Sequence, residues 1–101
     1  MASPEQYPCR KSAPWRVLDT EALVVDVRGG LIYPLNRVAT RIWQLCDGAH
    51  TIDAIVRALV DEFDADEATI RSDAMTFLDE LARAGLIVIR DTPPATASRR
   101  G

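Results

Sequence analysis

The apolar residues of this chain change their spacing at Asn36, from every second position to every third and fourth position. Before Asn36, the side chains of Leu23, Val25 and Val27 alternate with their neighbours, a period typical of a half-buried strand. After Asn36, the apolar positions recur as they do along one face of an amphipathic helix. The sequence therefore predicts strands first and helices afterwards.

Three strands are predicted before the change of period. They cover residues 15–18, 23–27 and 31–35. Residues 19–21 are expected to form the first turn, and residues 28–30 (Arg-Gly-Gly) the second, because two successive glycines can adopt positive φ. Three antiparallel strands in sequence would form a meander.

Three helices are predicted after it. Asn36, Thr51 and Asp64 are the expected N-caps, and Asp64 is paired with Glu67 in a capping box. Gly48 is expected to end the first helix, Phe63 to lie near the end of the second, and Gly85 to end the third. Residues 86–89 continue as an extended apolar run. This order predicts an α+β domain with the helices stacked on one sheet face.

Composition sets the expected limits of the folded domain. Residues 1–14 contain three prolines and few apolar side chains, and residues 91–101 contain two prolines and small polar residues. Both segments are predicted to be disordered, as an arm and a tail around a folded domain at 15–90. No window resembles a secretory signal or a membrane span, so we expect a cytoplasmic protein that does not enter a membrane.

The charged residues argue against nucleic acid as a partner. The chain has a net charge of -3. A winged-helix DNA-binding protein is the main alternative function, with the third helix as its reading helix. That helix carries Arg71 and Arg83 against five acidic residues, which would face phosphate groups of the same charge.

No reactive cluster is apparent in the sequence. Cys46 and His50 are four residues apart, but Gly48 separates them, and two ligands are too few for a zinc site. The acidic residues between 61 and 67 lack the pattern of a calcium loop. Both cysteines, Cys9 and Cys46, are expected to be free thiols. We therefore predict a protein that is not an enzyme and needs no metal or cofactor, against the alternative of a small enzyme subunit.

The third predicted strand comes last in the meander and is expected to have a free edge. Proline is tolerated where its missing N–H faces away from the neighbouring strand, so Pro34 and Ile32 should direct their backbone groups outward. An added strand would pair mainly with Gly30, Ile32 and the Pro34 carbonyl. On the third helix, a shoulder widens the apolar stripe and either borders a groove or packs on the second helix or the tail. Its residues are Arg71, Met75, Leu78 and Ala82.

The order and spacing of many small motifs resemble the PqqD-like family, the stand-alone recognition elements for ribosomally made, modified peptides. The resemblance covers residues 15–89. Its first part is Tyr33-x-Leu35-Asn36, Ala39, Ile42-Trp43, Asp47-Gly48, Thr51, Ile55, Leu59 and Phe63. Its second part is Asp73, Phe77-Leu78, Leu81 and Gly85-Leu86-Ile87.

This resemblance implies a winged-helix-like fold that binds the leader segment of a precursor peptide as a fourth strand, between the third strand and the third helix. It also implies delivery of the leader to a modifying enzyme, such as a radical S-adenosylmethionine enzyme, or a leader peptidase in lasso peptide pathways. The protein itself would be a monomer or a weak homodimer. The predicted peptide-binding residues are Gly30, Leu31, Ile32, Tyr33, Pro34, Arg71, Asp73, Ala74, Met75 and Leu78.

Overall fold

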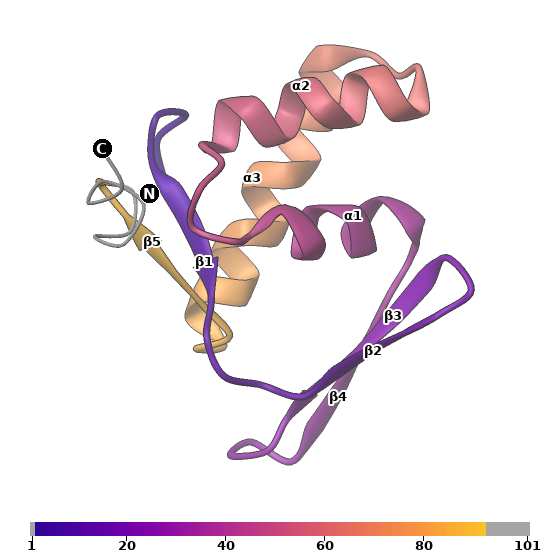
Figure 1. Ribbon diagram of the computed structural model, residues 1–101, viewed down its shortest axis with the longest axis vertical. Helices are drawn as coiled ribbons and strands as arrows, with labels where there is room; N and C mark the ends of the chain where they lie inside the picture. Colours follow the sequence, from indigo (N-terminus) through magenta and orange to yellow (C-terminus); the bar gives the residue numbers. More distant parts are fainter. Residues whose placement is uncertain (1, 93–101) are drawn as a thin grey trace.

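The computed structural model describes residues 2–92, and within them the chain forms two β-sheets and three helices (Figure 1). The elements in chain order are β1 (Tyr7–Arg10), β2 (Trp15–Leu18), β3 (Glu21–Asp26), β4 (Leu31–Leu35), α1 (Arg37–Leu45), α2 (Ile52–Phe63), α3 (Glu67–Arg83) and β5 (Ile87–Arg90). One sheet has the order β2-β3-β4 and is antiparallel throughout. The other pairs β1 with β5. The predicted α+β fold, a three-stranded meander followed by three helices, is confirmed.

One face of the β2-β3-β4 sheet packs against α1. Its side chains at Ala22, Val24 and Leu35 are buried there. The buried face of β3 is thus the opposite one to the predicted apolar set, of which Leu23 is 37% exposed and Val27, beyond the end of the strand, is 70% exposed. The sheet lies below α1 in Figure 1, α2 lies above that helix, and α3 runs from α2 past α1 to β5. Trp43 of α1 is fully buried and meets the ring of Trp15 edge to face at 6.0 Å. The sheet and the helices therefore share one core centred on α1.

Thr40 ties α1 to the ends of β3 and β4. Its side chain is buried, and its hydroxyl accepts a hydrogen bond from the Ala22 N–H at 2.8 Å. The same hydroxyl donates to the Leu35 carbonyl at 3.3 Å. The Thr40 side chain thus supplies hydrogen-bond partners for a backbone N–H and a backbone carbonyl at the end of the paired strands. This contact fixes the position of β4 relative to α1.

We expect Thr40→Val to destabilise the fold, because valine keeps the shape of the side chain but leaves the Ala22 N–H and the Leu35 carbonyl without a partner. A buried unsatisfied polar group costs about 1–3 kcal/mol. Urea unfolding followed by circular dichroism measures the loss, with Thr20→Val, at an exposed turn residue, as the matched control. Equal stabilities of the two variants would contradict this role of Thr40.

The predicted caps of the first two helices are confirmed, and that of the third is wrong. Asn36 and Thr51 accept hydrogen bonds from the N–H groups of Ala39 and Ala54. Asp66, and not Asp64, caps α3 by accepting from the N–H of Thr69. Asp64 instead ends α2 in the left-handed conformation, with φ of 48°. Asp64 and Asp66 are the same residue type in one short linker, so the sequence does not show which of them is the N-cap. The backbone conformation shows it.

The segment before Trp15 differs from the predicted disordered arm. Strand β1 pairs with β5, and the same segment also binds the loop between α1 and α2. The Pro8 carbonyl accepts from the N–H of Gly48 at 2.9 Å, and the Arg10 N–H donates to the Cys46 carbonyl at 2.8 Å. Composition alone underestimates the order of such a segment, because backbone hydrogen bonds to distant residues hold it in place.

Arg10 anchors this segment to the C-terminal end of α1. Its guanidinium donates to the carbonyls of Trp43 at 2.9 Å and Gln44 at 2.8 Å. It also lies 5.2 Å from the ring centroid of Trp15. A cation is favourable at a helix C-terminus, where unpaired carbonyls concentrate negative partial charge. Arg10 therefore joins β1, β2 and α1.

The predicted tail, residues 91–101, lies almost entirely outside the described residues. At its first position, the Asp91 carboxylate accepts a hydrogen bond from the Gln6 side chain at 2.7 Å. Within residues 2–92, no helix is both long enough and apolar enough to cross a membrane.

Candidate peptide-binding edge

Strand β4 forms one edge of the β2-β3-β4 sheet, as predicted from its place in the chain. Its only strand neighbour among the described residues is β3, to which it is paired from Leu31 to Leu35. The side chains of Leu31 and Ile32 are 53% and 63% exposed. An exposed edge strand with apolar side chains is a template on which another chain can add a strand.

The hydrogen bonds of β3 determine which β4 backbone groups are free. The Val25 N–H donates to the Pro14 carbonyl at 2.9 Å, so the backbone of Val25 faces β2. Because successive residues of a strand turn their backbone groups to opposite sides, Val24 faces β4, where its partner is Tyr33. The N–H and C=O groups of Ile32 therefore point away from the sheet.

The same alternation applies to the other even-numbered positions of this edge. The Pro34 carbonyl points outward, and proline has no N–H that would need a partner. The Gly30 N–H is already used in the turn, where it donates to the Asp26 carbonyl at 2.8 Å. Gly30 has a φ of 69°, which glycine adopts without strain. The β4 edge thus offers one free donor, the Ile32 N–H, and two free carbonyls, those of Ile32 and Pro34.

An apolar depression of about 310 Å³ lies beside the end of β4, between α1 and α3. Its wall on the α1 side begins at Asn36, the residue that follows β4. Its apolar residues are half-buried or buried, and the carboxylate of Asp73 is exposed at its border. The lining residues are Asn36, Val38, Ala39, Ile42, Ile70, Asp73 and Phe77. Such a hollow fits an apolar side chain next to a basic group.

The α3 residues that were predicted to bind the peptide do not lie together on one surface. Asp73 borders the depression. Ala74 and Leu78 are fully buried in the core, and Met75 is half-buried against it. Arg71 lies toward α2, where it donates to the Asp53 carboxylate at 2.8 Å. The α3 wall of the depression is formed by Ile70 and Phe77, which are not among the predicted peptide-binding residues.

Arg71 is bound by two carboxylates. Besides Asp53, it pairs with Glu67 one turn earlier on α3, at 3.1 Å. The hydrogen bond from Arg71 is the main cause that lowers the pKa of Asp53 below its ordinary value. Through its contact with Asp53, Arg71 links α3 to α2. Ala82, at the far end of the predicted shoulder, lies beside Ala2 and Ile89, so it packs near the N-terminal segment and β5.

Cys46 and His50 do not converge on one site. The Cys46 side chain is fully buried, whereas the His50 ring is half-exposed and lies 2.9 Å from the Asp47 carboxylate. Desolvation opposes the charged form of Asp47, but the hydrogen bonds from the His50 ring and from the backbone N–H groups of Ala49 and His50 outweigh it and lower the pKa of the carboxyl. Among the described residues there is no group of three or more potential metal ligands from cysteine, histidine and carboxylate side chains.

Both cysteines are free thiols, as predicted. Burial raises the pKa of Cys46 from 9.0 to about 12. Since the folded state holds this proton more tightly than the unfolded state, the stability that it contributes is complete below pH 9 and is lost as the pH rises toward 12. At pH 8 the thiolate is a very small fraction, and access to it is blocked.

We therefore expect a thiol reagent at pH 8 to modify the folded protein at Cys9, which is half-buried, and not at Cys46. Unfolding in guanidinium should make both residues reactive. Mass spectrometry of the alkylated protein distinguishes the two sites. Modification of Cys46 at the same rate in the folded and the unfolded protein would contradict its burial.

Comparison with known proteins places these features in a family context. A family model described as "Coenzyme PQQ synthesis protein D (PqqD)" matches residues 21–87. Two proteins of Rhodopseudomonas palustris called "PqqA binding protein" are similar in sequence. That of strain ATCC BAA-98 / CGA009 is 42% identical over 60 residues, which are 58% of this chain and 59% of the relative. That of strain TIE-1 is 40% identical over the same length and the same shares. The chain thus aligns with about three fifths of each relative.

A solved structure is similar over most of its length. It is TbiB1 in complex with the TbiA(beta) leader peptide. The two chains superpose with a TM-score of 0.70 at 26% sequence identity, and the match covers 78% of this chain and 93% of the other. The similarity thus extends from sequence to the arrangement of the strands and helices.

Proposed function

The chain belongs to the PqqD family, and from this membership we propose that it binds the leader segment of a ribosomally synthesised precursor peptide. The leader adds to the free edge of β4 as a fourth strand of the sheet. The observation that carries this proposal is the outward-facing backbone of Ile32 on a free sheet edge, together with the apolar depression that begins at Asn36, just after β4. The names of the relatives, a PqqA binding protein and a complex with a leader peptide, agree with it.

In this mode of binding, main-chain hydrogen bonds supply affinity and side-chain pockets supply selectivity. The turn residue Gly30 and the β4 residues Leu31 to Pro34 form the backbone side of the site. An apolar leader side chain enters the depression between α1 and α3, against Ile70 and Phe77. The Asp73 carboxylate selects a basic leader residue at the border. In this proposal, Ile70 and Phe77 form the α3 side of the site. Four other predicted α3 residues are left out, because their surroundings leave them little contact with an added strand: Arg71, Ala74, Met75 and Leu78.

We further propose that the bound leader is presented to a separate modifying enzyme, either a radical S-adenosylmethionine enzyme or a leader peptidase or cyclase. The protein needs no chemistry of its own for this role. Its potential nucleophile Cys46 is buried with a raised pKa, and its histidine is engaged with Asp47. Binding and presentation are sufficient for an adaptor.

The alternative of a DNA-binding winged helix is disfavoured by the charges on α3. Asp66, Glu67 and Asp73 are exposed along that helix, and Arg71 is already paired with two carboxylates. Insertion of α3 into a groove would bring these carboxylates close to phosphate groups. DNA binding would also show a steep dependence on salt.

Titration calorimetry tests the proposal, using synthetic leader peptides encoded by small open reading frames beside the gene. We expect saturable binding of one leader per protein that changes little with salt, and no heat from a mixed-sequence DNA duplex at low salt. Binding of the duplex without binding of any leader would replace the peptide-binding function by the DNA-binding alternative.

A further inference from the structure

Strand β2 forms a second free edge, on the opposite side of the sheet from β4. All four of its residues are exposed, including Trp15 at 38%, Val17 at 37% and Leu18 at 52%. Because the Pro14 carbonyl pairs with Val25, the backbone groups of Trp15 and Val17 alternate to the outer side. These two residues therefore offer unpaired N–H and C=O groups along this edge.

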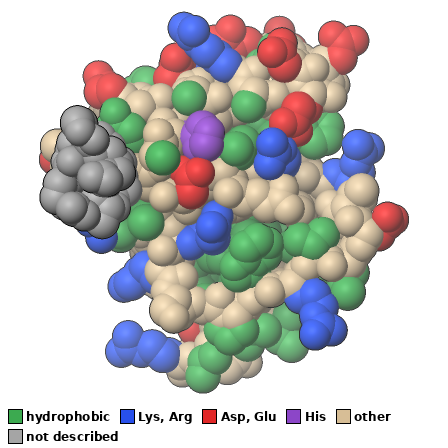
Figure 2. Space-filling view, in the orientation of Figure 1, with side chains coloured by type: hydrophobic (Ala, Val, Ile, Leu, Met, Phe, Trp, Pro, Cys, Tyr) green, Lys and Arg blue, Asp and Glu red, His purple; other side chains and the backbone are tan. Residues whose placement is uncertain are grey.

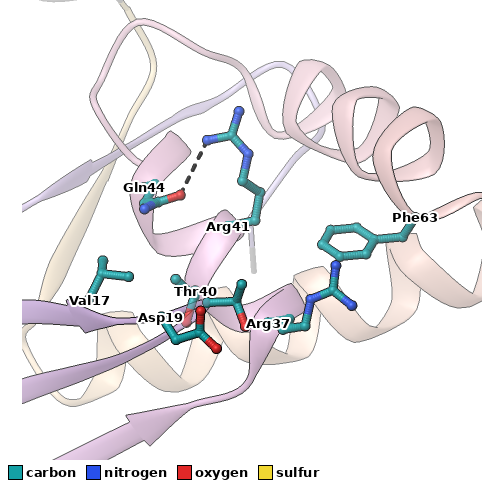
Figure 3. Close-up of a pocket in the computed structure, with 8 residues that line it drawn as sticks. Val17, Asp19, Arg37, Thr40, Arg41, Gln44 and Phe63 are labelled. Atoms are coloured by element: carbon teal, nitrogen blue, oxygen red, sulfur yellow. Dashed lines mark hydrogen bonds between the residues drawn. The ribbon is translucent and has the colours of Figure 1, made fainter.

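One face of α1 borders this edge. Arg37, Arg41 and Gln44 follow at helical spacing and line a pocket of about 230 Å³ together with Val17 of β2 and Phe63 of α2. Figure 3 shows these side chains arranged around the space between the strand and the two helices. The pocket and the free edge of β2 thus form one continuous site, which we call the β2 groove.

Positive charge predominates in the β2 groove. Arg41 is paired with Glu62, with its Nε 2.9 Å from a carboxylate oxygen. Arg37 lies over the ring of Phe63, 5.4 Å from its centroid, and makes no ion pair with any described residue. Arg10, at the Trp15 end, donates to two backbone carbonyls and makes no ion pair with a carboxylate among residues 2–92. Asp19 is the one unpaired carboxylate among the described lining residues.

The charge around the β2 groove is part of a larger asymmetry. The chain from residue 7 to 45 contains six basic and three acidic residues, whereas residues 46–90 contain four basic and ten acidic ones. In Figure 2, acidic side chains are concentrated over the helical end at the top, and Lys and Arg side chains surround hydrophobic ones in the lower half. A negatively charged ligand is therefore attracted to the end of the molecule that contains the β2 groove.

We propose that the β2 groove binds an extended acidic segment of a partner protein, which adds to β2 as an outer strand. Its backbone pairs with Trp15 and Val17, and its carboxylates reach Arg37 at one end and Arg10 at the other. Opposite charges across an interface steer association and fix the register of the two chains. The groove is thus distinct in place and in charge from the depression beside β4.

Pairing of β2 with a second copy of the chain fits less well. A register that joins Trp15 to Val17 of the second copy places two Arg16 side chains directly opposite each other, which is repulsive. A register centred on Val17 joins Trp15 to Asp19, whose φ of 65° ends the strand.

Since the two sheet edges are separate, a leader on β4 and an acidic segment on β2 can bind together. The modifying enzyme is a natural source of this segment, and this identification alone rests on the proposed function.

Amide NMR with a designed probe tests the inference. The probe is a seven-residue peptide of alternating valine and glutamate, and the control has lysine in place of glutamate. We expect the glutamate peptide to shift the amides of Trp15 and Val17 and the Nε signal of Arg37, with an affinity that falls as salt is added. The lysine peptide should leave these signals unchanged.

Variants distinguish this site from the leader site. Val17→Pro should weaken binding of the glutamate peptide about tenfold or more, because an outward donor is removed. Arg37→Glu should weaken it at least about threefold, and Arg28→Glu, at an exposed turn residue, should not. Ile32→Pro should leave it unchanged. Equal shifts with the lysine peptide, shifts confined to β4, no shifts at millimolar peptide, or self-association that Val17→Pro removes would each overturn the inference.

Discussion

Ile32→Pro is expected to weaken leader binding about 10- to 100-fold while the protein stays folded. The substitution removes the only free backbone donor that we assign to the β4 edge, and leaves a leader carbonyl buried without a partner, at a cost of about 1–3 kcal/mol. It costs little in the free protein, because the Ile32 N–H has no partner within the sheet. Calorimetric titration measures the affinity, and circular dichroism monitors the helices.

Tyr33→Pro is the matched control for this substitution. The Tyr33 N–H faces Val24 across the ladder, so its loss should reduce the stability of the sheet. The two neighbouring prolines are therefore expected to have opposite effects, one on binding and one on stability. Unfolding of the Ile32 variant at ordinary temperature would mean that Ile32 faces β3 and that the assigned register is wrong.

Ala39→Trp is expected to reduce leader affinity by about 10- to 100-fold, because a large ring on α1 occupies the depression that receives the apolar leader side chain. Burial of one such side chain contributes roughly 1.5–3 kcal/mol, which is lost when the depression is filled. Ala39 is half-buried at the surface, so the larger ring can be placed with little effect on the core.

Ala68→Trp, at an exposed position in the first turn of α3, controls for the general effect of a new tryptophan. Fluorescence polarisation with a labelled leader compares the two variants, and thermal unfolding confirms that both are folded. Unchanged affinity in the Ala39 variant would remove the depression from the site and leave the β4 edge alone as the binding surface.

The elements of the fold could be predicted from the sequence because their signals are local. The extended period of β3 and the caps at Asn36 and Thr51 depend on residues close to each other in the chain. Both faces of β3 carry apolar side chains, so the alternation predicted the strand but not that Val24, rather than Leu23, faces the core. Strand β1 was missed because its order comes from β5 and from the α1–α2 loop, which are distant in sequence. No pattern within residues 7–10 reports such partners.

Only part of the candidate site could be predicted, because some of its features depend on local sequence and others on contacts between distant residues. The free edge of β4 follows from strand order and from Pro34, both of which are visible in the sequence. The α3 wall was placed on the side of Arg71 and Met75, because a helical wheel gives the apolar stripe but not the neighbour that each flank meets. The ion pair of Arg71 with Asp53 turns that flank toward α2, and leaves Ile70 and Phe77 beside α1.

Hydrogen exchange at the Ile32 amide tests the central claim most directly. In the free protein this N–H points to solvent and should exchange much faster than the Tyr33 amide, which is paired with Val24. Saturation with a leader peptide should protect Ile32 strongly and change Tyr33 little, because only an added strand supplies the missing acceptor. An Ile32 amide that exchanges equally fast in the saturated complex would contradict strand addition at β4.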